Sequence, residues 1–163
     1  FKNPQDYPAD TFSSVGTHDM TPLRMWWFGG DIELKYQLKI IKTSGEKAAA
    51  YKQREADRKM LLDALDYNQV WPKDNLRTSD CLYGEGYPNG LTEAVEAFVA
   101  KSSSKVFLAQ PEDIFEAEKL QNLPGMDRDK HPNWRRKLPV KMCDWLSDER
   151  FIRCIKAIKT YRG

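Results

Sequence analysis

Several features that mark particular classes of protein are missing from this sequence of 163 residues. It has no run of eighteen or more apolar residues, and its start has no basic-then-apolar signal pattern. Its 26 basic and 24 acidic residues nearly cancel, leaving a formal net charge of +2. Nucleic-acid-binding proteins usually carry a marked basic excess on one face. We therefore expect neither a membrane nor a nucleic acid among the partners.

Cysteine and histidine are scarce. Cys81, Cys143 and Cys154 form no C-x-x-C pair, and only His18 and His131 could complete a metal site. A structural zinc site or a redox dithiol is not expected from so few ligands. The spacing instead favours reduced thiols in a cytoplasmic protein.

The remaining composition is that of an ordinary globular protein, with 40% hydrophobic and 31% charged residues. The length is enough for one domain with a core. The chain opens Phe-Lys-Asn-Pro, without an initiator methionine. Either a processed terminus or a piece of a longer polypeptide would produce such a start.

Two β-favouring runs are each followed by a helical signal. The first, Thr11–Val15, ends at Gly16, and Thr21 followed by Pro22 predicts a helix capped by the threonine. The second, residues 105–110 (KVFLAQ), predicts a short buried strand because it is apolar on both faces.

Helical segments fill most of the remaining chain. Asp31 is a plausible cap for a helix over 32–42, and residues 46–67 favour a surface helix. Thr92 is expected to cap an amphipathic helix. Ser147 is expected to begin the last helix, with a buried stripe at Phe151, Ile152, Ile155 and Ile158. Residues 68–90 read as a loop.

This order predicts a helix-rich α/β fold with about two short parallel strands. Two parallel strands alone do not make an independent sheet. The chain is therefore either the last pair of β/α units of a larger parallel sheet or a helical domain with two strands.

Polar side chains follow each predicted strand. In a β/α barrel, functional residues lie at the C-terminal ends of the strands. His18 and Asp19 follow the first strand. After the second strand come Gln110, Glu112 and Asp113, and the loop beyond adds Asn122, Asn133, Trp134, Arg135 and Arg136. Carboxylates, amides and an aromatic ring suit a polyhydroxylated substrate, and a carboxylate can stabilise an oxocarbenium-like transition state.

Two motifs make the pattern specific. Residues 15–27 (VGTHDMTPLRMWW) and residues 122–138, which begin Asn-Leu-Pro-Gly and end Pro-Asn-Trp-Arg-Arg-Lys-Leu, occur in this order. Both resemble signatures of glycoside hydrolase family 77, the 4-α-glucanotransferases (amylomaltases). Met25, where glycine is usual, and residues 115–116 depart from the common pattern, which leaves the subfamily open.

The resemblance implies an activity and roles for individual residues. It implies transfer of α-1,4-glucan segments between maltooligosaccharides, in starch, glycogen and maltose metabolism, without a metal or organic cofactor. Asp19 matches the carboxylate that stabilises the transition state, and His18 matches an adjacent sugar-binding residue. Asn122, Asp113 and Trp134 are the further candidates for contact with substrate. The family's nucleophile and acid/base lie on earlier strands and have no counterpart here, so we expect the isolated chain to be inactive.

The resemblance also implies a fold. Residues 1–163 would be the C-terminal portion of a (β/α)8 TIM barrel, comprising the last two β/α units with a helical insertion around residues 31–90.

Other interpretations remain for the individual residues. His18 and Asp19 could be only a helix entry, Asp113 a helix cap, and Asn122 part of a turn. Trp134 could pack inside its loop. For the whole chain, the alternative is a non-catalytic glucan- or protein-binding helical module. A fragment that folds on its own could also self-associate through the exposed barrel surface at Val106, Phe107 and Leu108.

Overall fold

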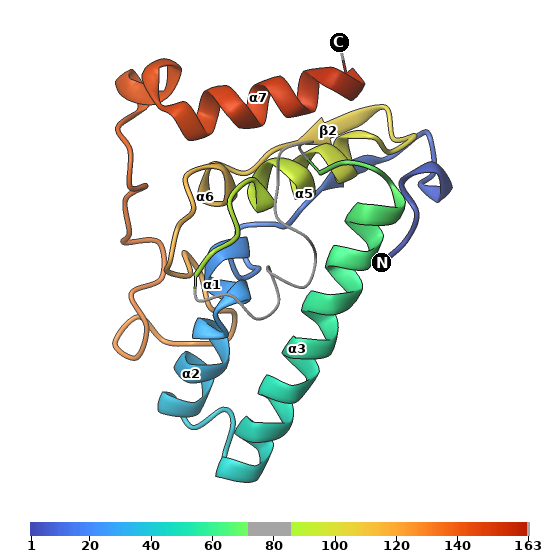
Figure 1. Cartoon of the computed structure of the whole chain (residues 1–163). Helices are drawn as coiled ribbons and strands as arrows, with labels where there is room; N and C mark the ends of the chain where they lie inside the picture. Colours follow the sequence, from blue (N-terminus) through green and yellow to red (C-terminus); the bar gives the residue numbers. More distant parts are fainter. Residues whose placement is uncertain (72–85, 163) are drawn as a thin grey trace.

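The computed structural model describes residues 1–71 and 86–162 (Figure 1). Strands β1 (Phe12–Ser14) and β2 (Val106–Leu108) pair in parallel, with Phe12 opposite Val106 and Ser14 opposite Leu108. The predicted pair of short parallel strands is therefore confirmed. Most of the predicted loop over 68–90, together with Cys81, lies outside the described residues.

Helices account for about half of the described chain. They are η1 (Pro4–Asp6), α1 (Leu23–Trp27), α2 (Gly30–Gln37), α3 (Ser44–Tyr67), α5 (Leu91–Ala100), α6 (Pro111–Ile114), η2 (Met142–Ser147) and α7 (Glu149–Arg162). In Figure 1, α7 runs along α5 on one side of the molecule, whereas α2 and α3 extend away on the other. No helix in the described part of the chain is long and apolar enough to cross a membrane.

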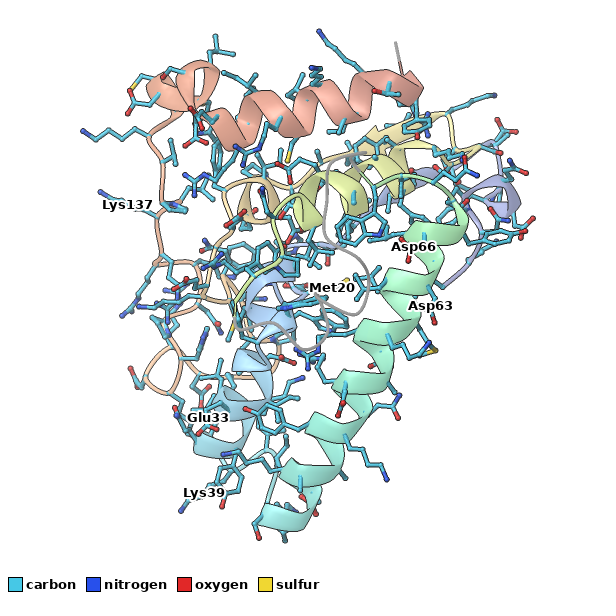
Figure 2. All side chains as sticks on the ribbon, viewed as in Figure 1. Met20, Glu33, Lys39, Asp63, Asp66 and Lys137 are labelled. Carbon is cyan, nitrogen blue, oxygen red and sulfur yellow. The ribbon has the colours of Figure 1, made fainter. Side chains whose placement is uncertain are left out.

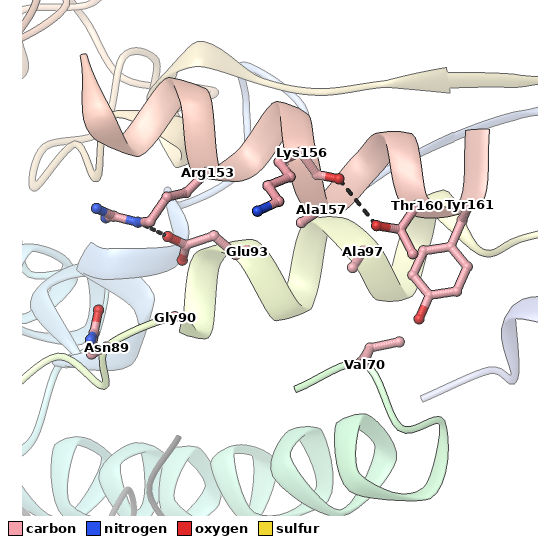
Figure 3. Close-up of a pocket in the computed structure, with 10 residues that line it drawn as sticks. All are labelled: Val70, Asn89, Gly90, Glu93, Ala97, Arg153, Lys156, Ala157, Thr160 and Tyr161. Atoms are coloured by element: carbon pink, nitrogen blue, oxygen red, sulfur yellow. Dashed lines mark hydrogen bonds and ion pairs between the residues drawn. The ribbon is translucent and has the colours of Figure 1, made fainter. Parts of the chain in front are cut away.

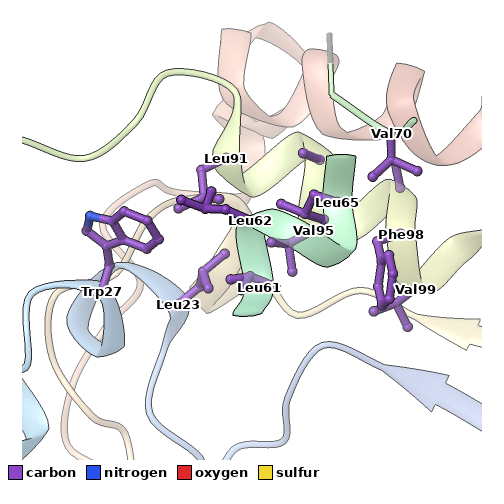
Figure 4. Close-up of a cluster of buried hydrophobic side chains, with 12 residues drawn as sticks. Leu23, Trp27, Leu61, Leu62, Leu65, Val70, Leu91, Val95, Phe98 and Val99 are labelled. Atoms are coloured by element: carbon purple, nitrogen blue, oxygen red, sulfur yellow. The ribbon is translucent and has the colours of Figure 1, made fainter. Parts of the chain in front are cut away.

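The core lies where α1, α3 and α5 meet (Figure 4). Leu62 and Leu65 of α3 and Leu91 of α5 are fully buried there, beside Trp27 of α1. Helix α5 was expected to be amphipathic, but all ten of its residues are buried. The reason is that α5 is surrounded: β1, α3, α6 and α7 all contact it.

Three predicted helix caps are wrong. Helix α1 begins after Pro22 rather than at a Thr21 cap, and Gly90 rather than Thr92 is the cap of α5. Helix α2 follows Gly29 in the left-handed region, so Asp31 lies inside its first turn. In the last two cases a glycine with positive φ turns the chain into the helix, which a side-chain cap would not explain.

Asp31 has a different role, which joins α2 to α3. Arg54 of α3 forms two parallel hydrogen bonds with the Asp31 carboxylate, at 2.9 and 3.0 Å. The same guanidinium donates to the Trp26 carbonyl and lies over the Trp26 ring, 4.7 Å from its centroid. One buried arginine therefore ties together α1, α2 and α3.

The helix boundaries differ in detail from the prediction. Helix α2 ends at Gln37, five residues before the predicted end, and Thr43 starts α3 through a capping box with Glu46. Ser147 belongs to η2, and α7 begins at Glu149.

The predicted stripe of α7 is confirmed only in part, since Phe151, Ile155 and Ile158 are partly buried and Ile152 is not. Cys154 is its buried residue, whereas Ile152 is half exposed. Phe151 and Trp145 pack with Cys154 against Phe115. Cys154 and Cys143 are both free thiols.

Strand β2 was expected to be buried on both faces, and this is wrong for the described chain. Val106 and Leu108 are 40% and 53% exposed, and Phe12 on β1 is 73% exposed. Phe107 points the other way and packs on the core. A parallel strand is buried on both faces only where layers cover both, and here helices cover the Phe107 face alone.

Candidate functional site

The loop between β1 and α1 carries His18 and Asp19 at the C-terminal end of β1. It is a tight turn, in which the Met20 amide donates to the Thr17 carbonyl at 2.8 Å. Gly16 lies close to the end of β2, because a Cβ at this position would be only 3.2 Å from Gln110 Oε1. A side chain at Gly16 would therefore require the end of the Gln110 side chain to shift slightly.

The second segment of the site is the loop from Gln121 to Trp134, which is held closed by buried Asn133. The Asn133 Oδ1 atom accepts hydrogen bonds from the Leu123 amide at 2.8 Å and from His131 Nδ1 at 2.7 Å. Its Nδ2 atom donates to the carbonyls of Leu123 and Met126. Since an amide oxygen only accepts, the contact places a proton on His131 Nδ1.

These two segments meet at Asp19 and Asn122, although 103 residues separate them. The Asn122 side-chain amide donates to Asp19 Oδ1 at 2.5 Å. On the other side, His18 Nε2 lies 3.4 Å from Asp19 Oδ2. Asp19 is therefore held from both sides, yet 45% of its side chain remains exposed to solvent.

Trp134 completes the group. Its ring centroid is 5.1 Å from that of His18, with the planes tilted by 47°. The residue adopts a left-handed backbone conformation, φ 60°, which is uncommon for a bulky side chain. Its amide donates to the Gln121 carbonyl at 3.0 Å, and its side chain is largely exposed. The Trp134 ring is therefore not packed inside its loop.

Four of the five candidate residues thus form one exposed cluster, hereafter the Asp19 cluster: His18, Asp19, Asn122 and Trp134. The arrangement offers a carboxylate, an amide, an imidazole and a flat ring on one surface, which is the chemistry that binds a sugar. Their contact with a substrate stays a prediction.

Asp113, the fifth candidate, is placed differently. It is buried, and its Oδ1 atom accepts a 2.7 Å hydrogen bond from the Leu23 amide at the start of α1. Burial raises the pKa of this carboxyl to about 6, and the bond from Leu23 partly opposes that rise. Asp113 therefore supplies the cap that Thr21 does not, and it fixes the helix that follows the Asp19 loop.

Sequence reasoning missed the part played by Asn133 and His131. Both lie in or beside the Pro-Asn-Trp-Arg motif, but only the folded loop shows that Asn133 joins the turn after Asn122 to the position of Trp134. Among residues 1–71 and 86–162, no group of three or more His, Cys, Asp or Glu side chains could hold a metal ion.

Two cavities are lined by none of the four residues of the Asp19 cluster. One of about 360 Å³ is mostly apolar and has Gly16, Met20 and Asp113 in its wall. The other, of about 420 Å³, lies between α5 and α7 (Figure 3), where Arg153 pairs with Glu93 at 2.5 Å. It contains none of the candidate residues.

Comparison with known proteins identifies the family. The family model for glycoside hydrolase family 77, 4-alpha-glucanotransferase, matches residues 1–142, and the chain belongs to this family. It is 29% identical to a 4-alpha-glucanotransferase of Haemophilus influenzae over 161 residues, which are 99% of this chain and 21% of that protein.

A solved structure supports the fold. The chain superposes on amylomaltase from Corynebacterium glutamicum with a TM-score of 0.81 and 24% identity, covering 96% of this chain and 23% of that one. The chain thus spans about a fifth of the length of the relatives it matches.

Proposed function

We propose that this chain contributes the transition-state-stabilising carboxylate, Asp19, to a retaining 4-α-glucanotransferase acting on α-1,4-glucans. The observation that carries the proposal is the Asp19 cluster, in which residues of both family motifs meet around one half-exposed carboxylate. Family membership supports the same activity.

Each member of the cluster has a distinct task in this proposal. Asp19 binds vicinal hydroxyls of the sugar at the cleavage subsite, and its negative charge stabilises the oxocarbenium-like transition state. Asn122 and His18 hold the carboxylate in place from its two sides. Trp134 offers an apolar ring on which a glucose face can stack.

Retention needs two further carboxylates that flank the bond, one as nucleophile and one as acid/base. The motifs present here match neither of them. We therefore propose that the 163-residue chain is catalytically silent by itself and binds glucan weakly. It would form the last two β/α units of a (β/α)8 barrel, with α2 and α3 as a helical insertion. The cytoplasmic location stays a prediction.

The test is disproportionation of maltotriose by a 4-α-glucanotransferase polypeptide that contains this sequence. Asp19→Asn should lower kcat/KM on the order of 10²-fold or more, because it removes a charge aimed at the transition state. Asp127→Asn, at an exposed position in the second loop, is the matched control and should leave the rate unchanged. Full activity of the Asp19→Asn variant would show that His18 and Asp19 are only a helix entry.

The alternative function is a non-catalytic glucan-binding module. The exposed Trp134 ring beside His18 favours it as a description of the isolated chain. Turnover of maltotriose by the 163-residue chain alone would contradict both this alternative and the silence proposed above.

A further inference from the structure

A polar cavity of about 690 Å³ lies between the segment after α6 and the start of α7. Its apolar lining residues are Phe115 and Ala117, which are buried, and Pro139, which is exposed. Cationic side chains dominate its wall: Arg24, Lys119, Arg135, Arg136, Lys137 and Arg150. This size is within the range of small-molecule sites, roughly 300–1,000 Å³.

The two carboxylates in this wall are already engaged. Glu116 accepts from Arg24 Nη1 at 2.9 Å, and Glu118 accepts from Arg24 Nε at 3.0 Å. Both carboxylates are therefore paired with the same arginine, Arg24. Arg150 is likewise occupied, by Asp148 at 2.8 Å.

Four cations remain without a partner. Across the described residues, Lys119, Arg135, Arg136 and Lys137 form no ion pair and no side-chain hydrogen bond. The Nε atom of Arg136 is also buried, and no group in residues 1–71 or 86–162 accepts a hydrogen bond from it. The unsatisfied donor of Arg136 is costly because it is buried. Lys119, Arg135 and Lys137 are exposed, so solvent screens part of the repulsion among the four charges. An anion in the cavity would remove both costs.

The position of the cavity indicates what would carry the anion. Gln121 lines it and directly precedes Asn122, while Arg135 directly follows Trp134. The bond between the Trp134 amide and the Gln121 carbonyl holds these two chain segments together. The cavity therefore adjoins the Asp19 cluster along both segments. Figure 2 shows Lys137 at the edge of the molecule, on the segment that leads to η2.

We propose that this cavity binds a phosphate monoester of a sugar. Arginine presents a planar fork of donors that matches phosphate oxygens, and Lys137 and Lys119 add compact positive charges. Pro139, which lines the cavity and is exposed, offers an apolar contact for the sugar. The choice of a sugar as the carrier rests on the proposed function, because the cavity adjoins the Asp19 cluster, whereas binding of the phosphate group is measured independently of transferase activity.

The test is a calorimetric titration of the 163-residue chain with glucose 6-phosphate, with glucose as the neutral control. Saturable binding of glucose 6-phosphate that weakens with added salt is expected, and much weaker binding of glucose that does not depend on salt. Arg136→Gln should weaken binding about tenfold, the loss expected for one charge-assisted hydrogen bond. Lys137→Gln, which replaces an exposed side chain, should weaken the binding of glucose 6-phosphate several-fold. This variant tests the proposal if Arg136→Gln does not fold.

Arg128→Gln is the matched control, because Arg128 is exposed in the same loop but does not line the cavity. Equal weakening by Arg128→Gln, or equal binding of glucose, would overturn the proposal, as would the absence of saturable binding. Inorganic phosphate and a maltooligosaccharide carrying one phosphate distinguish the source. If the phosphorylated maltooligosaccharide binds most tightly, the natural ligand is a phosphorylated glucan. If glucose 6-phosphate binds most tightly, it is a free sugar phosphate.

Discussion

At the scale of single residues, the main point is that neighbouring polar groups have unlike environments. Asp19 is half exposed and supported by Asn122, whereas Asp113 is buried and supports a helix. The sequence predicted that each aspartate follows a strand, and the structure confirms this for both. It could not distinguish their roles, since the partner of Asp113, the Leu23 amide, is 90 residues away.

Glu96 provides a prediction at this scale. It is fully buried in α5, and neither carboxylate oxygen has a hydrogen-bond partner among the described residues. Burial, with a smaller contribution from nearby Asp113, raises its pKa well above the usual value. The folded chain thus keeps the Glu96 proton to a higher pH than the unfolded chain does.

Stability should therefore fall as the pH rises above the ordinary glutamate value of about 4.5, because the unfolded state gains by ionising and the folded state does not. Asp113, with its pKa of about 6, adds a loss of the same sign between about 4 and 6. Glu96→Gln should be more stable than the parent at pH 7 and similar to it at pH 4, as measured by urea unfolding. An identical pH dependence in parent and variant would contradict the account.

At the scale of elements, local sequence signals predicted the strands and the helix α3 but not where three other helices begin. The two strands and the long helix α3 follow from β-favouring runs and helix-forming residues, and these were predicted. The N-termini of α1, α2 and α5 were not, because Gly29, Gly90 and the distant Asp113 do what a local side-chain cap was expected to do. The full burial of α5 was missed for a similar reason, since it depends on α7 covering the outer face.

The Arg54–Asp31 pair tests the connection between α2 and α3. Arg54→Met should destabilise the chain by about 3–5 kcal/mol, because it leaves the buried Asp31 carboxylate without its main partner. Lys59→Ala breaks the exposed Lys59–Asp63 pair on the same helix and should cost less than about 1 kcal/mol. Chemical denaturation of both variants measures the difference, and equal losses would show that the buried pair has no special role.

At the scale of the whole molecule, the chain presents an uncovered sheet face. Phe12, Val106 and Leu108 are exposed on β1 and β2, with one face of the sheet covered by helices. Exposed apolar strands promote association between chains. We propose that this face drives self-association of the 163-residue chain.

Sedimentation velocity over a range of concentrations tests this proposal. The average mass of the parent should rise with concentration, and Leu108→Lys should suppress the rise by placing a charge in the face. Leu146→Lys is the control, because Leu146 is also exposed but lies in η2, outside the sheet. A parent that stays monomeric throughout would refute self-association through the sheet.

The most direct test of the central claim is an NMR titration of this chain with maltotriose. The Asn122 side-chain amide and the Trp134 indole N–H report on two corners of the Asp19 cluster. Both signals should shift together on titration, and both shifts should be lost in Asp19→Asn while the fold is kept. Shifts that persist unchanged in Asp19→Asn, or that appear only at other residues, would contradict the claim that these side chains form one glucan-binding site.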